Sequence, residues 1–144
     1  MGRRARRDGG VDQSNVSIAE HAVDAFNARD VELFASMTSS DFEWFPSMIA
    51  VEGEGFRGSD GVARYFETLE SAWDYFRVVA ERFVEGDGLV LLIGHLEGCG
   101  RNSGARVESE LGMAFDLRDG LITRIRGYLN QQEALVAVGL ADRG

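Results

Sequence analysis

The chain of 144 residues contains no lysine, so all 15 of its strongly basic side chains are arginines. A protein without lysine cannot form a Schiff base on its own side chain, and it cannot use the lysine of a phosphate-binding loop. A single cysteine, Cys99, excludes an internal disulfide bond and a zinc site built from several thiolates. These absences remove several common kinds of site before any motif is considered.

Positive charge and long apolar runs are also scarce. The net charge is −9, which argues against a nucleic-acid partner because phosphate binding needs clustered cations. No apolar run approaches the roughly 18 residues that a membrane-spanning helix needs. We therefore expect no nucleic-acid partner and no membrane partner, and the low cysteine content favours a cytoplasmic location.

The start of the chain, MGRRARRDGG, is rich in arginine but is not followed by an apolar stretch. It therefore does not match an export signal. We expect residues 1–15 to form a disordered tail, residues 16–140 a single domain and residues 141–144 a second short tail. A domain of this length can bury a substantial core.

Helical spacing marks the first part of this domain and its end. The segment SIAEHAVDAFNARD opens with Ser17 and Glu20, which match a capping box. Asp30 is placed to cap a short second helix, and a longer third helix follows the glycine-rich loop. Near the end, NQQEALVAVGL predicts a short helix capped by Asn130 and ended by Gly139.

Between the third and the last helix, apolar and polar residues alternate as they do in β-strands. Four strands are predicted there, and DFEWF, residues 41–45, suits a further edge strand because Pro46 follows it. The residues RDG at 118–120 predict a three-residue hairpin turn, which would place Met113 opposite Ile125.

The order α-α-β-α-β-β-β-β-α predicts an α+β fold. We expect a cone-shaped roll, in which a curved antiparallel sheet wraps around three helices. The mouth of such a cone is a favoured place for a small ligand.

Three stretches resemble SnoaL-like proteins of the nuclear transport factor 2-like superfamily, which includes ketosteroid isomerases, polyketide cyclases and limonene epoxide hydrolases. They are FNARDVELFASMTSSDFEW, FRGSDGVARYFETLESAWDYF and FDLRDGLITRIRGYLNQQEALVAVGL. The resemblance extends from Ser17 to Leu140. It implies the fold more strongly than a reaction, because this fold serves many enzymes and also binding modules.

The resemblance also shows which catalytic groups this chain lacks. The tyrosine of ketosteroid isomerases falls on Ala22, their basic aspartate on Phe45 and their protonated aspartate on Met113. The relay aspartate of limonene-type epoxide hydrolases falls on Gly127. Both mechanisms are therefore disfavoured, because none of these four residues can transfer a proton.

Two residues remain candidates for catalysis. Glu43 would face the cavity if Phe45 does, and a carboxylate among aromatic rings could act as a general base. A bulge near Pro46 would instead turn Phe42 and Trp44 inward and leave Glu43 in water. The second candidate is His95, which lies two residues before Glu97 and could pair with it.

The predicted ligand pocket is defined by residues that match the inner face of the cone. They are Ala22, Phe26, Trp44, Phe45, Tyr65, Met113, Phe115 and Ile125. The implied ligand is a small hydrophobic molecule, with no cofactor and no metal site. Two functions stay open: a cofactor-independent cyclase, isomerase or dehydratase acting on a hydrophobic carbonyl compound, or a non-catalytic binding or dimerisation module.

The strand that begins LVLLI, residues 89–93, is apolar on both faces at its start. Residues on its outer face need to be covered. We therefore expect a homodimer that packs through the outer face of the sheet, where Arg124, Arg126 and Tyr128 are also expected.

Overall fold

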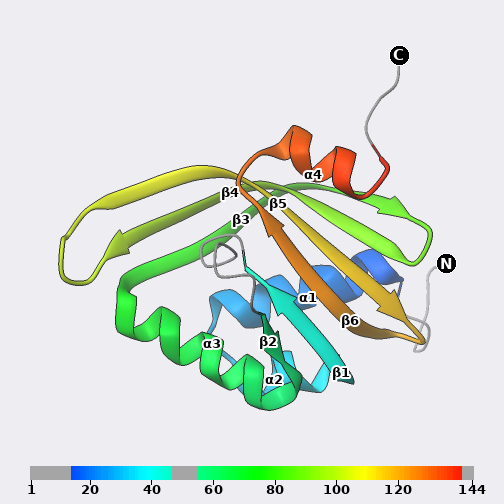
Figure 1. Cartoon of the computed structure of the whole chain (residues 1–144), viewed down its shortest axis with the longest axis horizontal. Coiled ribbons are helices and arrows are strands. Elements are labelled where there is room, and N and C mark those ends of the chain that lie inside the picture. Colours follow the sequence, from blue (N-terminus) through cyan, green and yellow to red (C-terminus); the bar gives the residue numbers. More distant parts are fainter. Residues whose placement is uncertain (1–13, 47–54, 141–144) are drawn as a thin grey trace, which may run out of the picture.

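The structure is a computed structural model that describes residues 14–46 and 55–140 (Figure 1). The described residues form the following elements: α1 (Asn15–Asn27), α2 (Val31–Ser36), β1 (Thr38–Phe45), β2 (Phe56–Arg57), α3 (Gly58–Ala72), β3 (Trp73–Gly86), β4 (Leu89–Gly100), β5 (Arg106–Arg118), β6 (Leu121–Tyr128) and α4 (Gln131–Ala137). The two expected tails lie outside the described residues, except that residues 14 and 15 begin the first helix. No helix in the described part of the chain is long and apolar enough to cross a membrane.

The strands form one curved sheet in the order β2-β1-β6-β5-β4-β3. Helices α1, α2 and α3 lie against one face and α4 against the other (Figure 1). The predicted α+β fold is thus confirmed. The sheet is mixed rather than wholly antiparallel, because β1 pairs with β6 in the parallel direction.

The helix caps show where side chains fix the ends of the elements. Helix α1 begins one turn earlier than expected, because the Ser14 hydroxyl rather than that of Ser17 caps it, accepting from the Ser17 backbone N–H at 3.1 Å. Asp30 caps α2 and Asn130 caps α4, as the sequence predicted. The left-handed backbone of Gly139, with φ +76°, follows α4 and suits a residue without a Cβ atom.

The turn after α1 ties this helix to the edge strand β3. The Asn27 side chain donates to the Val78 carbonyl at 2.9 Å and accepts from the Val78 N–H at 3.0 Å, as a neighbouring strand would. The Arg29 guanidinium donates to the carbonyls of Phe26 and Phe76 at 2.7 and 2.6 Å. Two side chains of the segment FNARD therefore hold α1 at a fixed position over the sheet.

The β5–β6 hairpin has a different register from the predicted one. Its turn contains two residues, Asp119 and Gly120, both with positive φ, and a bulge follows between the 116 and 117 pairings. Phe115 therefore lies opposite Ile125, and Met113 lies opposite Gly127. The two-residue turn and the bulge together shift the strand pairing. Beyond the bulge Phe115 and Ile125 still face the helices, and next to the turn Ile122 is buried there.

Helix α4 covers apolar residues on the outer face of the sheet. Ala134 packs there against Leu91, Ile93 and Ala114. A Cβ atom on Gly112 would collide with the Ala134 methyl group, so the absence of a side chain at 112 lets α4 lie directly on β5. Helix α4 thus covers part of the outer face that a second subunit was expected to cover. The homodimer stays a prediction, which sedimentation velocity can test.

Substituting Gly112 by alanine is expected to lower the free energy of unfolding by about 1–3 kcal/mol, because the added methyl group overpacks this contact. Urea denaturation measures the change. The double variant Gly112→Ala/Ala134→Gly removes the opposing methyl group and should recover part of the loss. Equal stabilities for Gly112→Ala and the native protein would show that α4 does not pack as closely as described.

Candidate functional site

The space between the helices and the sheet contains two small apolar cavities. The first, of about 10 Å³, is lined by Ala22, Val23, Phe26, Phe34, Trp44, Val78, Met113 and Phe115. The second, of about 20 Å³, is lined by Phe26, Trp44, Pro46, Tyr65, Phe76, Val78, Leu96, Leu111, Met113 and Gly127. Each volume corresponds to roughly one water molecule, so in this conformation neither cavity has room for a substrate.

Six of the eight residues predicted for the pocket line these cavities: Ala22, Phe26, Trp44, Tyr65, Met113 and Phe115. Ile125 is fully buried in the same core but is not among the lining residues. Phe45 lies on the other face of β1, because side chains alternate along a strand and Phe42 and Trp44 are both buried in the core.

The orientation of β1 also decides where Glu43 lies. Its carboxylate pairs with the guanidinium of Arg57, its neighbour on β2, with Oε2 and Nη1 3.0 Å apart. Strand β1 therefore has the second of the two orientations described above, with Phe42 and Trp44 facing the core. Glu43 is therefore an edge residue in an ion pair, without access to the apolar cavities.

Tyr65, on α3, is among the residues that line the second cavity, and it carries a buried hydroxyl group. Burial raises the pKa of this hydroxyl well above its ordinary value, so it stays protonated at neutral pH. The Trp44 ring lies edge-on to the Tyr65 ring, with centroids 4.5 Å apart. Between them these two residues supply a hydroxyl and an indole N–H, and both groups can donate a hydrogen bond.

No aspartate, glutamate or histidine is among the described residues that line the two cavities. Met113 lines both cavities and Gly127 lines the second. The cavity walls therefore carry no charge in the described part of the chain.

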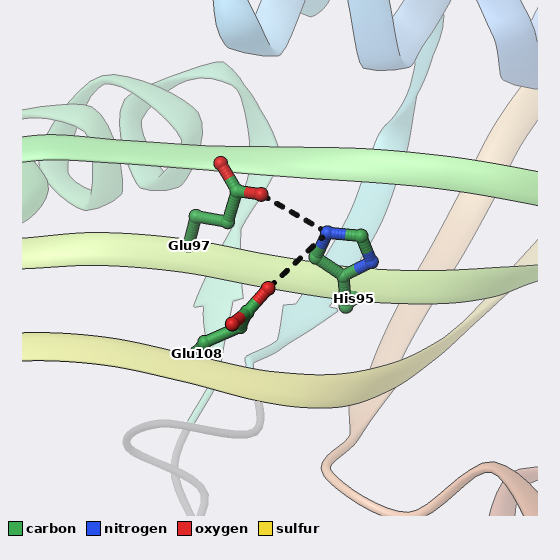
Figure 2. A group of neighbouring side chains, drawn as sticks. All are labelled: His95, Glu97 and Glu108. Carbon is green, nitrogen blue, oxygen red and sulfur yellow. Dashed lines mark hydrogen bonds and ion pairs between the residues drawn. The ribbon is translucent and has the colours of Figure 1, made fainter.

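The other candidate, His95, lies on the opposite face of the sheet. Its Nε2 is 3.0 Å from Glu97 Oε2, so the predicted pairing of these two side chains is confirmed. Two further acids join them: Glu81 Oε2 lies 2.9 Å from Nδ1, and Glu108 Oε2 lies 3.8 Å from Nε2. Figure 2 shows His95 and Glu97 on β4 and Glu108 on the adjacent β5, with their side chains converging.

The acidic neighbours affect the charge of this group. Hydrogen bonds to Glu81 and Glu97 raise the pKa of His95, and the bond from His95 lowers the pKa of Glu97. The His95–Glu97 pair was predictable because both residues lie in one strand. Glu81 and Glu108 were not, because they join His95 only through the pairing of β4 with β3 and β5.

Comparison with known proteins identifies the family. The model of the SnoaL-like domain matches residues 19–125. The chain belongs to the SnoaL-like domain family. No curated protein sequence matches it.

The same fold occurs in several solved structures of low sequence identity to this SnoaL-like chain. An NTF2-like protein of unknown function from Burkholderia pseudomallei has 16% identity and a TM-score of 0.73, with 87% of this chain and 97% of that one covered. TerC, co-crystallised with polyporic acid, has 21% identity and a TM-score of 0.71, with coverage of 87% and 95%. A putative polyketide cyclase from Pseudomonas putida has 18% identity and a TM-score of 0.67, with coverage of 83% and 93%.

Proposed function

We propose that this SnoaL-like protein binds a compact, neutral, mostly apolar molecule that carries a hydrogen-bond acceptor such as a carbonyl oxygen. The observation that carries the proposal is the composition of the two cavity walls. The lining side chains are all apolar except for Trp44 and Tyr65, which each carry one hydrogen-bond donor. Such walls favour an uncharged ligand, because burying an unpaired charge is costly.

The two cavities form one ligand site in this proposal. They share Phe26, Trp44, Val78 and Met113. Met113 has the most flexible side chain of these four, and a methionine can adopt another rotamer at low cost. Movement of Met113 would join the two spaces and make room for a ligand.

This composition favours the binding alternative over a cyclase, isomerase or dehydratase. General acid–base catalysis needs a proton-transferring group within hydrogen-bond reach of the substrate. Among the described lining residues, Tyr65 is the one with a titratable side chain. Its raised pKa suits a hydrogen-bond donor rather than a base.

Two nearly isosteric probes can test this site: acetophenone, which has a carbonyl oxygen, and ethylbenzene, which does not. Binding is followed by NMR of ¹³C-methyl methionine, since Met113 lines both cavities and Met37 does not. We expect a saturable shift of the Met113 signal, with roughly 5- to 10-fold tighter binding of acetophenone, which is the worth of one hydrogen bond.

The variant Tyr65→Phe keeps the aromatic ring and removes the hydroxyl. It should remove most of the preference for acetophenone while ethylbenzene binds as before. If neither probe shifts the Met113 signal at saturation, the cone interior is an ordinary core and the proposed function is wrong. If both bind equally well to the native protein, the hydroxyl does not select the ligand.

A further inference from the structure

We propose that His95, Glu97 and Glu108 bind a divalent transition-metal ion of the zinc type on the outer face of the sheet. This site lies on β4 and β5, on the face opposite the apolar cavities (Figure 2). It is therefore independent of the proposed ligand site. Three features of the described residues support it.

The first feature is the distance between the possible ligand atoms. One atom from each of the three residues lies within 4.8 Å of the other two. Nε2 of His95 is 3.0 Å from Glu97 Oε2 and 3.8 Å from Glu108 Oε2. Zinc–nitrogen and zinc–oxygen bonds of roughly 2.0–2.2 Å place neighbouring ligand atoms a little over 3 Å apart, so small rotations of the glutamates would suffice.

The second feature is the role of Glu81, which contacts the other ring nitrogen. Nδ1–H donates to Glu81 at 2.9 Å; loss of the Nε2 proton on metal binding would leave a neutral ring with its Nε2 lone pair on the side of Glu97 and Glu108. A histidine that binds a metal usually donates its other N–H to a carboxylate or carbonyl, which fixes the ring and its tautomer. Glu81 is thus the outer partner of the proposed site.

The third feature is independent of the histidine. Glu97 and Glu108 stand directly opposite each other in the β4–β5 register, and like charges at such positions destabilise a sheet. Arg77 lies 3.6 Å from Glu97, but among the described residues Glu108 has no ion-pair partner except His95. A divalent cation between the two carboxylates would relieve this repulsion.

The surroundings leave room for further ligands. A surface hollow of about 330 Å³ adjoins the two carboxylates and is lined by Tyr75, Glu97, Gly98, Arg106, Val107 and Glu108. Water molecules in this hollow could complete the coordination of the ion. One imidazole and two carboxylates suit zinc, cobalt or nickel better than calcium or magnesium, which prefer oxygen ligands only.

The test uses the full chain without an affinity tag, titrated with Zn²⁺ at pH 8 and followed by calorimetry and by NMR of the histidine rings. The chain has two histidines, so His21, exposed on α1, serves as an internal control. We expect one equivalent of Zn²⁺ to bind, with a shift of the Nε2 signal of His95 and no change in His21. Co²⁺ should bind in competition and give visible absorption bands.

Variants separate the proposed ligands from their neighbours. Glu97→Gln and Glu108→Gln should each weaken Zn²⁺ binding at least tenfold, while Glu81→Gln weakens it less. The matched control is Glu110→Gln, two residues from Glu108 on the same strand face, which should bind as the native protein does. Absence of saturable binding, a response of His21 equal to that of His95, or unchanged affinity in both ligand variants would overturn the proposal.

Discussion

Replacing Arg29 by methionine is expected to lower the free energy of unfolding by about 2–4 kcal/mol, because hydrogen bonds to a charged group are worth about 1.5–3 kcal/mol each. The guanidinium joins the carbonyls of Phe26 and Phe76 and lies over the Phe26 ring, 5.1 Å from its centroid. Methionine keeps the apolar length of the side chain but leaves the Phe76 carbonyl without this donor. Urea denaturation followed by circular dichroism measures the loss.

Two further variants show whether the guanidinium geometry or only its charge matters. Arg29→Lys keeps the charge but cannot donate to both carbonyls in the same way, so it should recover less than half of the loss. Arg118→Met is the surface control: the side chain of Arg118 is 66% exposed and has one long ion pair, to Asp41, so the change should stay within about 0.5 kcal/mol. Equal effects at 29 and 118 would contradict the structural role of Arg29.

Several local features of this fold were predictable from the sequence because they depend on residues close together in the chain. Asp30 and Asn130 cap their helices as expected, and β5 presents the predicted residues to the helices. The order of helices and strands was predicted from the same kind of pattern, before the SnoaL-like resemblance was considered. Each of these predictions rests on a short pattern that tertiary packing did not alter.

Features that depend on pairing between distant segments were missed. In the β5–β6 hairpin the two-residue turn shifts the register by one residue and the bulge shifts it by one more. The parallel pairing of β1 with β6 depends on the path of the chain through α3 and the β3–β5 meander. The position of α4 on the outer face depends on Gly112. The need for glycine at this position can be recognised only from the structure, in which Ala134 lies over it.

In the candidate site, too, features that depend on local patterns were predictable, and features that depend on pairing between distant segments were not. Six of the eight expected pocket residues line the cavities, and most of them belong to amphipathic elements. Which face of β1 turns inward was left open by the sequence. The cluster around His95 spans β3, β4 and β5. The sequence therefore indicated the His95–Glu97 pair within β4 but not Glu81 and Glu108, which lie on the neighbouring strands.

Trp44→Ala is expected to have the largest effect of any single substitution considered, a loss of about 3–5 kcal/mol in the free energy of unfolding, which is typical of removing a large buried aromatic side chain. Trp44 is 2% exposed, and its ring stacks on that of Phe34 with centroids 4.9 Å apart and planes at 9°. It also lines both cavities. The variant should remain folded in the cold, where its urea midpoint can be compared with that of the native protein.

Phe45→Ala is the matched control, one residue along the same strand but on the outer face. It should cost less than half as much, because Phe45 is only half-buried and lies outside the core cluster. Addition of indole should raise the melting temperature of Trp44→Ala more than that of Phe45→Ala, since the enlarged apolar cavity of Trp44→Ala matches indole and binding to the native state stabilises it. A larger loss for Phe45→Ala, or equal responses of both variants to indole, would mean that β1 presents its other face to the core, and Glu43 would then return as a residue of the cavity.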